Sequence, residues 1–124
     1  MRIFKYRTFR LWAKKEGISD RPLEAAISDI EKGLFEACLG SGLYKKRIAR
    51  KGQGKRSGYR TIIAFKKNNR AIFLYGYAKN EKDNISSKEE FVYKKLASYY
   101  LELNDNKLNL LIESGELFEV KYEI

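Results

Sequence analysis

The sequence predicts an α+β fold, in which N-terminal helices pack on one face of an antiparallel β-sheet and further helices follow at the C-terminal end. Two helical patterns occupy the first 36 residues, three β-type runs follow between residues 43 and 79, and helical patterns return after residue 84. The sequence contains no linker, low-complexity segment or internal repeat, and 124 residues is the length of one small domain, so we expect a single domain over residues 1–124.

Two amphipathic helices are expected near the N-terminus, after a short strand at residues 2–5. In residues 6–15 the apolar side chains recur at helical spacing, at Phe9, Trp12 and Ala13. Ser19 and Asp20 offer a cap for the second helix. Its apolar stripe consists of Leu23, Ile27, Ile30 and Leu34.

Three strands are expected next, at residues 43–49, 59–66 and 70–79. The sequence Gly40-Ser41-Gly42 breaks the helical pattern before the first of them. Because the second and third strands are joined by a tight turn, consecutive strands must run antiparallel. The loop at residues 50–58 holds three glycines and four cations, but it does not match the P-loop pattern, since Arg56 follows Gly54-Lys55 where Ser or Thr is required.

The C-terminal part predicts a long helix, a short helix and a final strand. Asn84 or Ser86 is expected to cap the long helix, which runs to about Leu103. Its candidate packing positions are Phe91, Leu96, Tyr99, Tyr100 and Leu103. After an interruption at Asn104 and Asp105, a short apolar helix ends at Gly115, and residues 117–122 suit a strand.

Basic residues are concentrated in the middle of the chain. The net charge is +10, but residues 37–80, which we call the acid-free stretch, hold twelve Lys and Arg residues and no Asp or Glu. They are Lys45, Lys46, Arg47, Arg50, Lys51, Lys55, Arg56, Arg60, Lys66, Lys67, Arg70 and Lys79. Surfaces shaped for solubility alone mix charges of both signs, so this stretch indicates a polyanion partner, and an RNA backbone is the one we expect.

Composition excludes several classes of site. With one cysteine and no histidine, the chain cannot form an intramolecular disulfide, and the commonest zinc ligands and the commonest general base are missing. We therefore expect no metal and no cofactor. No apolar run approaches the roughly 20 residues of a membrane span, and residues 1–7 lack the apolar core of a signal peptide, so a cytoplasmic protein without a membrane partner is expected.

The predicted strands gather cations on one surface. Alternation places Lys45 and Arg47 on one face of the first strand and Lys46 on the other, and Arg60 on the paired strand lies near the first two. Lys79 closes the third strand. Such a surface suits RNA cleavage by attack of a 2′-hydroxyl, in which cations stabilise the extra charge on the phosphate.

The sequence indicates the groups that transfer protons less clearly than it indicates the cations. A crowded lysine with a lowered pKa would act as the base or the acid, Glu81 is a candidate base, and Tyr75 or Tyr77 is a candidate proton donor or a platform on which a nucleobase stacks. The structural alternatives are packing of both tyrosines in the sheet, an exposed loop tip at Lys55 and Arg56, and an ordinary ion pair at Glu81.

Three segments, at residues 42–49, 51–61 and 73–81, resemble the RelE/HigB-like toxins of bacterial type II toxin–antitoxin systems. The similarity extends over nearly the whole chain and includes Gly115-Glu116-Leu117. It implies a RelE-like fold and a metal-independent ribonuclease that cuts mRNA on the ribosome. It also implies a cognate antitoxin, often with a helix-turn-helix domain.

Carried onto this chain, the resemblance and the charge pattern predict two groups of site residues. The candidate catalytic residues are Arg47, Lys55, Arg56, Arg60, Lys79 and Glu81. The candidate RNA contacts are Lys45, Lys46, Arg50, Lys51 and Tyr77, while Lys66, Lys67 and Arg70 are bystanders or ribosomal RNA contacts. The chain departs from cleaving relatives in having no histidine, and the equivalent of their C-terminal tyrosine is ambiguous among Tyr93, Tyr99 and Tyr100. Two alternatives remain open: a ParE-type toxin that inhibits DNA gyrase, and a catalytically inactive RNA-binding member of the fold.

Overall fold

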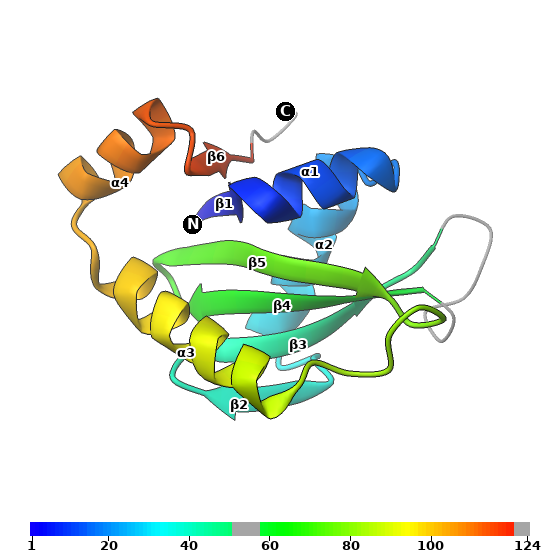
Figure 1. Cartoon of the computed structure of the whole chain (residues 1–124). Coiled ribbons are helices and arrows are strands. Elements are labelled where there is room, and N and C mark those ends of the chain that lie inside the picture. The colour runs from blue at the N-terminus through cyan, green and yellow to red at the C-terminus, as the bar shows by residue number, and fades with distance from the viewer. Residues whose placement is uncertain (51–57, 121–124) are drawn as a thin grey trace.

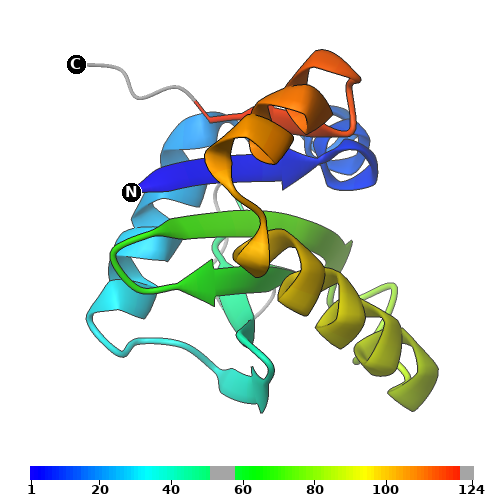
Figure 2. The ribbon, with the colours of Figure 1, turned by 90° about the vertical axis from the view of Figure 1, so that its left-hand side faces the viewer.

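In the computed structural model, which describes residues 1–50 and 58–120, a β-sheet separates helices on its two faces (Figures 1 and 2). The strands are β1 (Arg2–Tyr6), β2 (Ala37–Gly40), β3 (Leu43–Ile48), β4 (Tyr59–Lys66), β5 (Arg70–Ala78) and β6 (Leu117–Glu119). The helices are α1 (Arg7–Lys15), α2 (Asp20–Glu31), α3 (Ser87–Glu102) and α4 (Asp105–Glu113). The α+β class predicted from the sequence is confirmed.

The sheet has the strand order β2-β3-β4-β5-β1-β6. The three central strands β3, β4 and β5 pair antiparallel, as expected. The N-terminal strand β1 instead pairs in parallel with β5, from Arg2 opposite Arg70 to Lys5 opposite Phe73. Parallel pairing needs a long connection, which α1, α2 and the strands β2 to β4 supply here.

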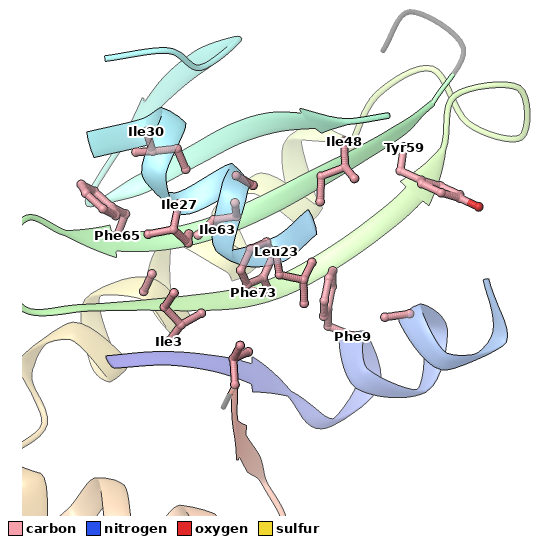
Figure 3. Close-up of a cluster of buried hydrophobic side chains, with 14 of the residues drawn as sticks. Ile3, Phe9, Leu23, Ile27, Ile30, Ile48, Tyr59, Ile63, Phe65 and Phe73 are labelled. Carbon is pink, nitrogen blue, oxygen red and sulfur yellow. The ribbon is translucent and has the colours of Figure 1, made fainter. Parts of the chain in front are cut away.

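The face covered by α1 and α2 holds one hydrophobic cluster, which Figure 3 shows in close-up. Leu23, Ile27 and Ile30 of α2 are buried there, as the predicted stripe requires. They pack with side chains of α1 and of the central strands, such as Phe9 and Phe73, whose ring centroids are 5.1 Å apart.

The opposite face, covered by α3, holds a second cluster. It contains Ala97, Tyr100 and Leu101 of α3 together with Phe4 and Leu74 of the sheet. Figure 2 shows α2 and α3 on opposite sides of the strands. The central strands are therefore covered on both faces, which explains why seven of the eight residues of β4 are buried.

Several details differ from the sequence prediction. Leu34 is 56% exposed, because α2 ends at Glu31 and Gly33 takes a positive φ of 82°, which removes Leu34 from the helical stripe. Phe91 and Tyr99 of α3 are 59% and 53% exposed. Ala97 is buried instead. Because its side chain is small, the pattern of large apolar residues along the helix does not predict its burial.

Two strands also differ in extent from the prediction. β2 is absent from the sequence prediction, because its four residues, Ala-Cys-Leu-Gly, show no alternation of polar and apolar side chains. The described part of the final strand is Leu117–Glu119, and residues 121 and 122 of the predicted strand lie outside the described residues. Within the described chain, no helix is both long enough and apolar enough to cross a membrane.

Candidate RNA-binding and catalytic surface

A row of three polar side chains crosses the sheet on the face that α3 covers. Arg47 of β3 lies directly opposite Arg60 of β4, and Arg60 lies directly opposite Tyr77 of β5. Residues that are directly opposed in antiparallel strands project to the same face. The sheet register therefore brings together two predicted catalytic residues and one predicted RNA contact, which we call the Arg47–Arg60–Tyr77 row.

A bulge in β5 decides which tyrosines reach this row. Ile62 pairs with Tyr75, but Ile63 pairs with Phe73, so Leu74 is an extra residue in β5. As a result Phe73 belongs to the cluster under α1 and α2, whereas Leu74, Tyr75 and Tyr77 all belong to the cluster on the α3 face. Strict alternation along β5 would have placed Phe73, Tyr75 and Tyr77 on one face.

The two arginines of the row create a site that favours an anion. Arg60 is only 5% exposed, and like charges placed directly opposite each other destabilise a sheet. The side chain of Arg47 is 40% exposed and is paired with the carboxylate of Glu36, with 4.0 Å between Nε and Oε1. A phosphate bound beside the two guanidinium groups would bring further negative charge and hydrogen-bond acceptors to this position.

Lys45 adds a cation in the neighbouring row, where it is opposite Ile62 on β4. Its Nζ donates a hydrogen bond of 2.7 Å to Oδ1 of Asn84, in the segment between β5 and α3. Because Asn84 is neutral, this bond positions the ammonium group and leaves its positive charge in place. The predicted sharing of one face by Lys45, Arg47 and Arg60 agrees with this geometry.

Tyr77 is a buried phenol with an unused hydroxyl. The residue is 4% exposed, and its hydroxyl has no hydrogen-bond partner among residues 1–50 and 58–120. Burial raises the pKa of Tyr77, although the charges of Arg60 and Lys82 act in the opposite direction. The phenol is therefore neutral at physiological pH and offers a hydrogen-bond donor.

Lys82, which sequence reasoning missed, is held beside the tyrosines by the start of α3. Its Nζ lies 2.6 Å from Oε2 of Glu89 and 3.3 Å from the hydroxyl of Tyr75. The hydrogen bond from Lys82 lowers the pKa of Glu89, and the bond to Glu89 raises the pKa of Lys82. Lys82 therefore stays protonated at neutral pH and is a cation rather than a general base. The detectable signal was the capping box of Ser86 and Glu89, which places an acid next to Lys82.

Other predicted site residues lie outside the row. Lys79 and Glu81 are exposed in the turn that follows β5, where the backbone N–H of Glu81 bonds to the carbonyl of Ala78. Arg50 lies over the ring of Tyr59, with its Cζ 5.6 Å from the centroid. Lys51, Lys55 and Arg56 lie outside the described residues.

Lys46 lies on the opposite side of the sheet from the row. It is 3% exposed, and its Nζ lies 3.1 Å from Oδ2 of Asp29 on α2. An ammonium group that is buried against α2 cannot contact a strand of RNA on the α3 face, so we leave Lys46 out of the proposed RNA surface.

Arg70 also has a structural role. Its guanidinium donates to the carbonyl oxygens of Tyr100 and Leu103 at 2.9 and 2.6 Å, and so ties the end of α3 to β5. No group of three or more His, Cys, Asp or Glu that would hold a metal ion occurs in the described part of the chain.

A family model described as RelE toxin of the RelE/RelB toxin–antitoxin system matches residues 1–120. The chain belongs to the RelE toxin family. No curated protein matches the sequence.

Membership of the RelE family shows in which kind of protein the residues of the α3 face occur. RelE-type toxins pair with an antitoxin, so this protein is the toxin component of a toxin–antitoxin system. The family model covers all the strands and helices described above, and with them Arg47, Arg60, Tyr77 and Lys82. In this RelE-type toxin, the α3 face offers fixed cations and tyrosine rings, which are the groups that RNA-binding proteins in general use to contact phosphates and bases.

Proposed function

We propose that this RelE-type toxin is a ribosome-dependent endoribonuclease that cuts mRNA and so inhibits translation. The observation that carries the proposal is the direct pairing of Arg47 and Arg60 across β3 and β4 on the face that also presents Tyr77. Two arginine side chains from rigid strands form a preorganised site for a phosphate whose negative charge increases in the transition state. The family resemblance supports the same activity and implies that no metal is needed.

The proposed reaction is attack of a ribose 2′-hydroxyl on the adjacent phosphorus. The new bond joins the 2′-oxygen to phosphorus, the bond to the 5′-oxygen breaks, and the products are a 2′,3′-cyclic phosphate and a 5′-hydroxyl. Arg47 and Arg60 hold the non-bridging oxygens, and Lys45, positioned by Asn84, gives a proton to the departing 5′-oxygen. Glu81 is exposed and lines the same pocket as Tyr77, and it is the proposed acceptor of the 2′-hydroxyl proton.

The test is cleavage of mRNA in purified translating ribosomes, with the 5′ ends of the products mapped. Arg47→Ala and Arg60→Lys are each expected to lower the cleavage rate by about 100-fold or more, because each removes donors aimed at the phosphate. Lys107→Ala is the matched control: it removes one positive charge from an exposed position of α4, outside the acid-free stretch. Addition of EDTA, at a level that the ribosomes tolerate, should leave the rate unchanged.

Intact mRNA with the wild-type toxin would overturn the proposal. If DNA gyrase is then inhibited, the protein acts as a ParE-type toxin. If the toxin binds RNA in a salt-sensitive manner without toxicity, it is an inactive RNA-binding member of the fold. Thermal unfolding of each variant separates loss of catalysis from loss of the fold.

We further propose that the cognate antitoxin, of the helix-turn-helix type that the resemblance implies, covers the α3 face with an acidic segment. The acid-free stretch supplies Lys45, Arg47 and Arg60 to that face, so an acidic segment is complementary in charge. Such binding would block the phosphate site and neutralise the toxin.

A further inference from the structure

A pocket of about 420 Å³ lies where β5 continues beyond the end of β1. The pairing of β1 with β5 stops at Phe73, because the chain turns into α1 after Tyr6. Figure 1 shows α1 alongside β5, with the segment that leads from β5 to α3 at the same end of the sheet as the end of β3 and the start of β4. The lining residues that matter here are Trp12, Tyr75, Gly76, Tyr77, Glu81, Lys82 and Tyr93.

Aromatic rings form most of the walls, and they are held in place. Tyr75 and Tyr93 stack with ring centroids 5.4 Å apart and an angle of 20° between their planes. Trp12 lies on the backbone of Gly76, since a Cβ atom at that glycine would come within 2.2 Å of the indole ring. The absence of a side chain at Gly76 is thus what allows Trp12 to reach this wall.

Polar groups at the pocket have capacity for a ligand. Tyr77 lines the pocket and is only 4% exposed. Its hydroxyl is buried and unsatisfied among the described residues, so a ligand completes this hydrogen bond when the side chains that cover the hydroxyl shift on binding. Lys82 contributes a cation whose Nζ lies 5.1 Å from the centroid of Tyr75, and Glu81 contributes an acceptor.

We propose that this pocket takes one nucleobase of the single-stranded RNA substrate, an inference that rests on the proposed function. A base presents a flat π-face to aromatic walls and polar edges to a hydroxyl, an ammonium and a carboxylate. Tyr77 belongs both to the pocket and to the Arg47–Arg60–Tyr77 row, so a base in the pocket would be attached to a backbone that passes the two arginines. The pocket would then set which nucleotide lies next to the cleaved phosphate.

The chain carries its own probe for this site, because Trp12 is the only tryptophan. Titration of the purified toxin with AMP, GMP, CMP and UMP should quench the fluorescence of Trp12 to saturation with at least one nucleotide. Ribose 5-phosphate, which has the sugar and phosphate but no base, should produce no saturable quenching. A free tryptophan derivative corrects for absorption of light by the nucleotides.

Tyr93→Leu should weaken the nucleotide affinity by roughly 5- to 150-fold, the range expected when one stacking ring is lost. Tyr99→Leu is the matched control, since it makes the same change on the same helix at a residue that is 53% exposed and does not line the pocket. Equal quenching by ribose 5-phosphate, no quenching by any nucleotide, or equal affinity in both variants would each overturn the inference. Ribosome assays run in parallel distinguish the two proposals. Cleavage without nucleotide binding would contradict only the proposed nucleobase pocket, and nucleotide binding without cleavage would contradict only the proposed endoribonuclease activity.

Discussion

At Tyr77 the proposed binding site and the stability of the fold favour different side chains. Its ring fills the core cluster on the α3 face, while its hydroxyl is buried without a partner in the described structure. Desolvation keeps the phenol neutral by raising its pKa. A protein selected for stability alone would carry phenylalanine at this position.

Tyr77→Phe is therefore expected to raise the free energy of unfolding by about 1 kcal/mol, because it removes an unsatisfied buried hydroxyl. The same change should weaken nucleotide binding and mRNA cleavage. Urea denaturation measures the first effect, and the Trp12 titration and ribosome assay measure the second. A variant that is less stable than wild type would show that the hydroxyl makes a stabilising bond in the folded protein.

Lys46 shows that a basic residue in the acid-free stretch is not automatically an RNA contact. Its neighbours Lys45 and Arg47 face α3, whereas its own ammonium group is paired with Asp29 under α2. We expect Lys46→Met to leave the cleavage rate within about twofold of wild type, because it removes no charge from the α3 face. A loss of cleavage as large as that of Arg47→Ala, in a variant with normal thermal unfolding, would contradict this placement.

At the scale of elements, the start of α3 couples helix capping to the cation at Lys82. The side chain of Ser86 accepts from the N–H of Glu89, and Glu89 accepts from the N–H of Ser86 and from Lys82. Glu89 has a lowered pKa, so its contribution to stability is complete above the pKa of the unfolded chain and disappears as pH falls through the lower folded value.

Glu89→Ala should accordingly lower the free energy of unfolding by about 1 kcal/mol at neutral pH. The difference from wild type should shrink as the pH is lowered through the folded pKa of Glu89, below its ordinary 4.5. Glu89→Gln, which keeps a capping oxygen but loses the charge, should be intermediate. Denaturation curves measured over this pH range provide the check, and a difference that does not change with pH would exclude the carboxylate charge as its source.

The bulge in β5 is the second feature at this scale. One extra residue, Leu74, turns Tyr75 and Tyr77 away from Phe73 and toward α3. Bulges are frequently found beside functional sites because they redirect side chains in this way. Here the bulge supplies Tyr77 to the Arg47–Arg60–Tyr77 row and both Tyr75 and Tyr77 to the aromatic pocket.

For the whole molecule, the distribution of charge governs how the toxin meets its partners. A net charge of +10, concentrated in the acid-free stretch, should accelerate association with an acidic antitoxin segment through long-range attraction. We expect the association rate constant, measured by stopped flow, to fall by at least about tenfold between about 50 mM and about 500 mM salt. The Arg47→Ala variant should show a shallower dependence on salt. Association that is independent of salt would place the antitoxin on another surface.

The order and type of most elements can be predicted from the amino-acid sequence, since helical stripes, strand runs and caps depend on local spacing. The charge pattern can be read from it as well, and the resemblance of residues 42–49, 51–61 and 73–81 agrees with the family match. Which of these residues meet is known only from the folded structure. Three features depend on contacts between segments far apart in the chain: the parallel pairing of β1 with β5, the burial of Lys46 against Asp29, and the packing of Trp12 on Gly76. A fourth, the extra residue Leu74 in β5, interrupts the regular alternation of the strand. Such pairings depend on register and on packing across the sheet, and these are properties of the whole fold rather than of any local run of residues.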